Sequence, residues 1–358
     1  MYRQIFHVEN NKKELKGMRS LITKMLRPAR VLIAGGALLA LQGCGMIYKT
    51  TGDILVSFGQ AELLPYMLAY DDVRMGCIMG EAQTPLLMSF ETVGSHPGRL
   101  GVMTFVTSAV CAEQLSLESE LRYLRAMKEG RVAEAQDARI EQKRWSALAA
   151  QRLLTAYQRL EVEYGKLDEG ECPKLNRKLD QLVWLVGNIA GAQALVADGA
   201  ADGVVGVPRD IVGKVARNAS CLSNENWWGA PEGLRATIWN LLPQLAPEGA
   251  QPWPKLEQSA EMGFEKGVRL GSAFLALSAY SKGDNDRLRK AIRDFAANDE
   301  NLDPDYAMID AIASVLIQGL SDRMWTEATG KRTPVNGLGT FWDDQPSSGS
   351  KVDIDDLL

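Results

Sequence analysis

The clearest chemistry in this 358-residue sequence belongs to Cys44, which ends the tetrapeptide Leu41-Gln42-Gly43-Cys44. An apolar run covers residues 31–41, and four basic residues precede it: Arg19, Lys24, Arg27 and Arg30. A basic flank, roughly 7–15 apolar residues and a small residue before the cut define a signal peptide. A thiol directly after the cut is the group that takes a diacylglyceryl chain through sulfur. We therefore predict cleavage after Gly43 and lipidation of Cys44.

This segment resembles the bacterial lipobox, with Gln42 where a small or β-branched residue is usual. The alternative is a transmembrane helix, but the apolar run is shorter than the roughly 20 residues that span a bilayer. Either Met1 or Met18 fits as the first residue. By resemblance to Gram-negative lipoproteins, Gly45 implies a lipid-anchored protein on the periplasmic face of the outer membrane.

The chain after residue 43 is acidic and nearly free of histidine. Residues 1–43 carry eight Lys and Arg against two Asp and Glu, so their removal takes the formal net charge from −5 to −11. This charge argues against nucleic acid as a partner. His96 is the one histidine left, so we predict neither a multi-histidine metal site nor a cofactor. We expect no enzyme, and a hydrolase using His96 is the weakest hypothesis because no G-x-S-x-G motif is present.

Four cysteines remain beside Cys44, and an even number in an oxidising compartment allows two disulfides. We expect Cys172 to pair with Cys221, because both lie at predicted helix ends. Cys77 and Cys111 lie inside apolar helical patterns. They are either bonded to each other or buried as free thiols.

Apolar residues recur at helical spacing along most of the chain, which predicts an all-α fold. The predicted helices cover residues 71–92, 99–115, 117–130, 132–164, 174–197, 209–221, 231–243, 254–280, 284–298 and 304–328. The stretch Gln181–Ala197 has no charged residue, and Gly187 and Gly191 in it permit close approach of another helix. Its polar residues Gln181, Asn188 and Gln193 favour a central buried helix over a membrane span.

The predicted domain organisation follows shifts in composition. After the signal peptide, residues 1–43, we expect a tether at 44–52 and a helical domain at 53–245. C-terminal helical hairpins follow at 254–330, beyond a stretch rich in proline and glycine. Residues 331–358 are predicted to form an acidic flexible tail. Phe341 and Trp342 within it are candidates to dock on the body or on a partner.

Two helices near the C-terminus carry elements of tetratricopeptide repeats. Leu270-Gly271-x-x-Phe274 and Ala291-x-x-x-Phe295, followed by Pro304, place a small residue at a helix crossing and an aromatic residue in the adjacent groove. We therefore predict antiparallel helical hairpins in a degenerate tetratricopeptide-like, α-solenoid array. Together with Cys44, this pattern resembles the T component of tripartite periplasmic transporters. The resemblance implies a non-enzymatic scaffold that forms oligomers, has a ligand-sized channel and associates with a periplasmic substrate-binding protein.

Two segments are candidates for binding a ligand or a partner. Trp227 and Trp228 are adjacent in a loop and offer aromatic faces for stacking. Val204 and Val205 lie in the loop 199–208, which is too apolar for a solvated linker. We predict a transport accessory protein that binds a partner protein or an apolar ligand in a concave surface or channel. The alternative is a structural lipoprotein of a cell-envelope assembly.

Overall fold

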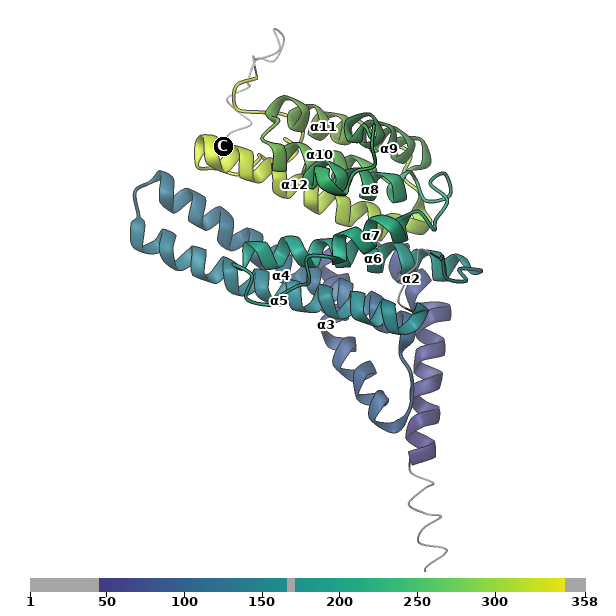
Figure 1. Ribbon diagram of the computed structural model, residues 1–358. Helices are drawn as coiled ribbons and strands as arrows, with labels where there is room; N and C mark the ends of the chain where they lie inside the picture. The colour runs from purple at the N-terminus through teal and green to yellow at the C-terminus, as the bar shows by residue number, and fades with distance from the viewer. Residues whose placement is uncertain (1–44, 166–170, 345–358) are drawn as a thin grey trace, which may run out of the picture. The chain divides into compact units, whose positions relative to one another are not determined.

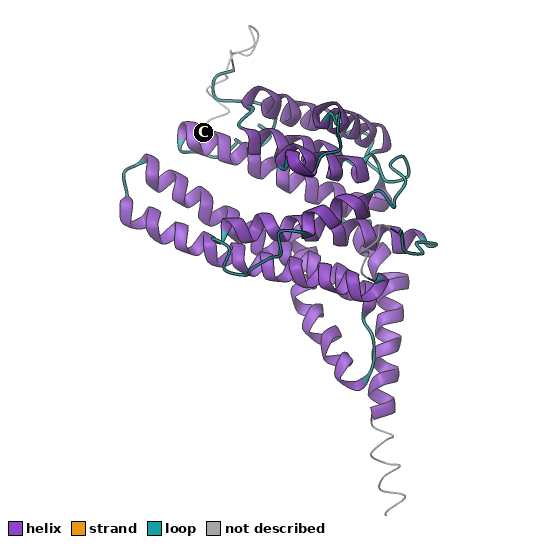
Figure 2. Ribbon diagram, in the orientation of Figure 1, coloured by secondary structure: helices purple, strands orange, loops and turns teal. Residues whose placement is uncertain are grey.

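A computed structural model describes residues 45–165 and 171–344, and within these ranges the chain forms helices and no strand (Figure 2). The predicted all-α fold is therefore confirmed. Cys44 and the signal segment lie outside the described residues, as does the C-terminal stretch 345–358.

The described chain divides into two units. The smaller contains residues 45–55 and 89–96, and the larger contains 56–88 and 97–344 without the undescribed gap. In the smaller unit residues 45–55 are helical, so the predicted tether has helical structure from residue 45 onward. The predicted division near residues 246–254 does not separate units, because the helices on both sides pack together.

The larger unit consists of helices joined mostly by short loops (Figure 1). Its first part contains the π-helical turn η1 (Gly59–Leu63), α2 (Leu64–Leu68) and α3 (Val73–Ser89), with η2 (Phe90–Val93) following in the smaller unit. The middle part contains α4 (Gly98–Lys128), α5 (Val132–Tyr164), α6 (Lys178–Ala200) and α7 (Ile211–Ala219). The last part contains α8 (Ala230–Leu241), η3 (Pro243–Leu245), α9 (Pro252–Lys266), α10 (Leu270–Lys282), α11 (Asn285–Ala297), η4 (Pro304–Tyr306) and α12 (Ala307–Thr329).

Helices α4 and α5 form a long antiparallel hairpin, and α6 packs against α5 (Figure 1). The two helices predicted at 99–115 and 117–130 are one continuous α4, because Ser116 is a tolerable helix residue and no Gly or Pro interrupts the stretch. On α6, a Cβ added at Gly191 would lie 2.5 Å from the Tyr157 ring. Only a glycine lets α5 and α6 approach this closely, so the predicted close helix contact is confirmed.

Helices α8 to α12 form the second group, in which neighbouring helices pack as hairpins. The helix predicted at 254–280 is two helices, because Gly267 has a φ of +75° and ends α9. The small residue predicted at a helix crossing is found at Gly271, where an added Cβ would lie 2.3 Å from the Ser259 carbonyl oxygen of α9.

Both pairs of cysteines form disulfides. Cys172 pairs with Cys221 as predicted, and Cys77 pairs with Cys111, which settles the open alternative for that pair. The Cys77–Cys111 bond links α3 to α4. The Cys172–Cys221 bond links the segment before α6 to the turn after α7. Among the described residues, α4 and α6 are long and apolar enough to cross a membrane, but more than half of each apolar window is buried inside the fold.

The predicted tail is folded in its first part. Residues 331–344 continue from α12, and the Phe341 side chain is only 3% exposed. The Arg289 and Arg293 guanidinium groups of α11 lie 4.7 and 4.9 Å from the Phe341 ring centroid. Arg289 also forms an ion pair with Asp343 at 2.9 Å. The predicted start of the flexible tail at residue 331 is therefore too early, because an aromatic anchor and acidic residues hold this segment to α11.

Candidate functional site

An apolar cavity lies inside the larger unit, enclosed by side chains of α4, α5, α6, α10 and α12 and by Trp228. We call it the inner cavity, and its volume is about 90 Å³. Helices α4, α6, α10 and α12 each contribute a stripe at spacings of mostly three and four residues, as in Val106, Val110 and Glu113 of α4, while α5 contributes Leu153. Such spacing places side chains on one helix face. The apolar wall therefore follows directly from the sequence periodicity.

A second, more open space lies next to the inner cavity. We call it the outer cleft; its volume is about 340 Å³, and it extends along α4, α5, α6, α10 and α12. Six side chains line both spaces, which are therefore adjacent: Val110, Glu113, Gln193, Leu277, Ile312 and Leu316. Together they have the size and apolar lining of small-molecule sites in proteins.

Glu113 is the one titratable side chain among the described residues that line the inner cavity. The residue is half-buried, and no ion pair or hydrogen bond within the described chain satisfies its carboxylate. Burial among apolar groups raises the pKa of Glu113 to about 7, because the charged form loses its hydration. Near neutral pH the carboxyl is therefore present in both protonation states.

The three polar side chains of the uncharged stretch of α6 have different roles. Gln181 donates to the Leu175 carbonyl oxygen at 3.0 Å and accepts from the Trp227 indole nitrogen at 2.9 Å. Asn188 accepts from the Asn218 side-chain amide at 2.8 Å. Gln193 lines both spaces, and its amide makes no hydrogen bond within the described residues. Two of these groups thus join neighbouring segments, while the third is free to meet a ligand.

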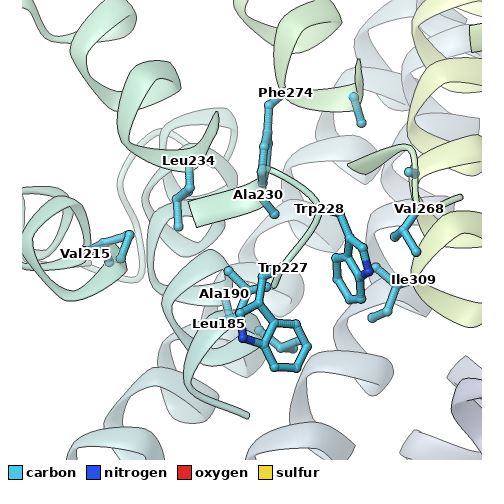
Figure 3. Close-up of a cluster of buried hydrophobic side chains, with 14 of the residues drawn as sticks. Leu185, Ala190, Val215, Trp227, Trp228, Ala230, Leu234, Val268, Phe274 and Ile309 are labelled. Carbon is cyan, nitrogen blue, oxygen red and sulfur yellow. The ribbon is translucent and has the colours of Figure 1, made fainter. Parts of the chain in front are cut away.

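Trp227 and Trp228 are both core residues, with exposed fractions of 1% and 4% (Figure 3). Their rings pack edge to face with centroids 5.2 Å apart, and Trp228 packs on Tyr306 at 4.6 Å. Trp228 has a φ of +54°, a strained conformation for a bulky residue. This backbone places its ring beside Val268 and Ile309 (Figure 3), where it forms part of the cavity wall. Of the predicted pair, only Trp228 reaches the cavity.

Val204 and Val205 line neither the inner cavity nor the outer cleft. Val204 is 71% exposed, while Val207 is buried. The buried Asp198 carboxylate accepts hydrogen bonds from the backbone nitrogens of Val205 and Val207, each at 2.9 Å. The loop is therefore fixed to the end of α6 instead of forming a channel wall as predicted.

His96 is an exposed residue of the smaller unit. Within the described chain no hydroxyl or carboxylate forms a hydrogen bond with its ring. The nearby Asp53 has a pKa below its ordinary value, chiefly because the Lys49 ammonium group donates a hydrogen bond to it.

Neither Glu113 nor Gln193 is among the site residues predicted from the sequence. A signal for Glu113 is nevertheless present: Val106, Val110, Glu113, Leu117 and Glu120 follow one another at spacings of four and three. The helix predicted at 99–115 places Glu113 in its last turn, where a charged residue is common. The continuous α4 places it in the middle of an apolar stripe. Comparisons with protein-family models, with curated proteins and with solved structures found no match for this chain.

Proposed function

We propose that this protein is a lipid-anchored periplasmic binding protein that holds an apolar small ligand in the inner cavity and outer cleft. It acts without catalysis, as an accessory component of a transport system, in the manner of the T components that its sequence resembles. The observation that carries the proposal is the apolar cavity, which shares six lining residues with an adjacent cleft of about 340 Å³.

Two further observations support the proposed compartment and mode of action. The two disulfides fit an oxidising environment such as the periplasm. The helices that form the cavity wall are otherwise tightly packed, with Leu153, Leu182 and Ala313 almost fully buried. A well-packed protein interior leaves few voids larger than a water molecule, so a retained apolar space indicates selection for an occupant.

The test is to fill the inner cavity. Ala313 lines it and is 1% exposed, so Ala313→Leu adds roughly three carbon atoms to a cavity of about 90 Å³. The full chain is purified from detergent-solubilised envelopes, and its binding of the neutral dye N-phenyl-1-naphthylamine is measured by fluorescence. We expect at least about a tenfold loss of affinity, equivalent to about 1.4 kcal/mol.

The matched control is Ala133→Leu, the same substitution at an exposed position of α5. It should bind the dye as the natural chain does. Circular dichroism of both variants shows whether overpacking has disturbed the helices, a cost of about 1–3 kcal/mol in a filled core. Equal dye binding by the natural chain and Ala313→Leu would contradict the proposal, and so would an envelope preparation that carries no small molecule by mass spectrometry.

A second candidate function is partner binding, either to a periplasmic protein or within a cell-envelope assembly. It is favoured by a surface groove of about 750 Å³ between α9 and α11, in which Phe264 and Leu275 lie among charged side chains. Helix 45–58 also exposes large apolar residues, among them Met46, Ile47 and Ile54. Cross-linking in intact cells followed by mass spectrometry tests this function. Cross-links from the α9–α11 groove to one recurrent protein, or to a second copy of this chain, would support it.

A further inference from the structure

We propose that the ligand is an organic ammonium ion with an apolar tail, and that the Glu113 carboxylate and the Gln193 amide bind its ammonium group. This inference rests on the proposed function and names the chemical class of the ligand. The tail would occupy the inner cavity, and the ammonium group would lie where the inner cavity meets the outer cleft.

The position of Glu113 carries the argument. A carboxylate partly shielded from water by apolar side chains is unfavourable unless an opposite charge or several hydrogen bonds compensate it. Within the described residues Glu113 has neither, although it lines both spaces beside Val110 and Leu277. A purely apolar ligand would be served as well by a leucine at this position. The carboxylate therefore indicates a ligand that brings a cation.

The charges that face Glu113 favour a cation over an anion. The other titratable side chains along the described lining of the outer cleft are Glu120, Tyr280 and Arg323. Arg323 is already paired with Glu120 at 2.7 Å, so its charge is largely compensated there. With Glu113 ionised the lining is net negative. A carboxylate or phosphate head group would be repelled, and an alcohol would leave the Glu113 charge uncompensated.

Gln193 adds to the selection between kinds of ammonium ion. Its side-chain carbonyl is a hydrogen-bond acceptor without a partner in the described chain, on the helix across from Glu113. A primary ammonium group has three N–H donors, enough to bond both a carboxylate and an amide oxygen. A quaternary ammonium has none. The two residues together therefore favour a primary amine.

Proton release offers a second readout. Burial raises the pKa of Glu113 to about 7, and a bound cation favours the ionised form. At pH 7, binding should then release roughly half a proton per ligand.

The experiment compares three eight-carbon probes that differ only in the head group: octylamine, octan-1-ol and octanoate. Binding to the full chain in nonionic detergent is measured by calorimetry at pH 7 in two buffers of different ionisation enthalpy. We expect octylamine to bind at least about tenfold more tightly than octan-1-ol, with proton release. In Glu113→Gln this preference and the proton release should vanish, while octan-1-ol binds as before. Gln193→Leu should weaken the binding of octylamine. The binding of a fourth probe with a quaternary head group, octyltrimethylammonium, should not change.

The charge control is Glu118→Gln on the same helix, whose side chain is 54% exposed and outside both spaces. It removes one negative charge and should leave the octylamine preference intact. Micelle partitioning differs between the probes and is measured for each without protein, while for any one probe it is the same for every variant and cancels. If all three probes bind equally, or if Glu113→Gln keeps the preference, the inference is wrong and the apolar site stands. If no probe binds the natural chain, the proposed function fails as well.

Discussion

Two carboxylates in neighbouring parts of the larger unit, the buried Asp310 and the half-buried Glu113, have opposite surroundings. Asp310, at the start of α12, is 2% exposed and accepts two hydrogen bonds from the Arg269 guanidinium group, at 2.6 and 3.0 Å. It also accepts from the Arg269 backbone nitrogen at 2.9 Å. The guanidinium group in turn donates to the Phe295 carbonyl oxygen and lies 3.9 Å from that ring centroid. Glu113 has none of these partners within the described residues.

The difference distinguishes a charge that is compensated within the fold from one that is not. The Arg269–Asp310 pair connects the beginnings of α10 and α12 with the end of α11, and every charged group in it is satisfied inside the protein. Burial raises the pKa of Glu113 to about 7, and no group within the described residues compensates its charge. Carboxylates with raised pKa values are common at binding and catalytic sites, which is why Glu113 is the candidate here.

Asp310→Ala should produce the largest effect on stability. The change leaves the Arg269 guanidinium buried without its counterion, which costs about 3–5 kcal/mol in comparable pairs. Urea denaturation followed by circular dichroism measures the loss. The double variant Arg269→Met/Asp310→Leu removes both charges and should recover most of it. If Asp310→Ala lowers the free energy of unfolding by less than about 1 kcal/mol, the Arg269–Asp310 pair contributes little to the stability of the fold.

Glu113→Gln should have the opposite sign at neutral pH. Because the pKa of Glu113 is raised from 4.5 to about 7, the folded state prefers the protonated form. That preference stabilises the fold fully below pH 4.5, and the stability is lost as the pH rises through about 7. Glutamine stays neutral, so the variant should gain roughly 2–3 kcal/mol over the natural chain at pH 8 and little at pH 4.

The measurement is the free energy of unfolding of both chains between pH 4 and pH 8. Glu118→Gln again serves as the control, since its side chain is exposed and the substitution should change the pH profile little. A Glu113→Gln profile parallel to that of the natural chain would mean that the carboxylate is compensated by a group in the folded protein.

Sequence patterns predicted the helices well and the site poorly, for physical reasons. The bounds of helix α5 were predicted correctly because Gly130 precedes it, Gly165 follows it, and an apolar stripe lies between the two glycines. Trp227 and Trp228 attracted attention by their type, yet a large aromatic residue is more often core than ligand surface. Packing decides between these roles, and packing depends on residues far away, such as Tyr306.

The partners of buried charges were equally hidden from the sequence. Arg269 and Asp310 are 41 residues apart, and nothing local marks them as a pair. Conversely, Glu113 and Glu118 are the same residue type on one helix but occupy different faces, and within the described chain only Glu118 has an ion-pair partner, Arg332. That difference is readable once α4 is known to be continuous through Ser116. The length of one helix therefore decided whether the candidate site could be found.

Asp180→Asn tests a paired carboxylate at the edge of the core, with a smaller effect. Burial alone would raise the pKa of Asp180, but hydrogen bonds from Arg177 and Arg99 outweigh burial and lower it. The resulting stability is present above the unfolded pKa near 4 and is lost as the pH falls below it. We expect a loss of about 1–2 kcal/mol at pH 7, discounted because Arg177 is more than half exposed.

This pH dependence has the opposite sign to that of Glu113 and occupies a lower range. Unfolding measured between pH 2 and pH 5 should show the natural chain losing stability on acidification more steeply than Asp180→Asn. Identical acid profiles would mean that the two arginines do not compensate the burial of this carboxylate.

The smallest expected effect belongs to Glu120 and Arg323 of the outer cleft. Their ion pair joins α4 to α12, and both side chains are about one fifth exposed. A double-mutant cycle with Glu120→Gln and Arg323→Gln, followed by the free energy of unfolding, should give a coupling of about 1 kcal/mol or less.

The same two variants also test whether charges along the outer cleft act on the ligand. Arg323→Gln leaves the Glu120 charge unpaired in the cleft and should tighten octylamine roughly two- to threefold at low salt, while Glu120→Gln weakens it by a similar factor. Equal binding by both variants would show that charges along the outer cleft do not act on the ligand, and the selection for a cation would then rest on Glu113 and Gln193 alone.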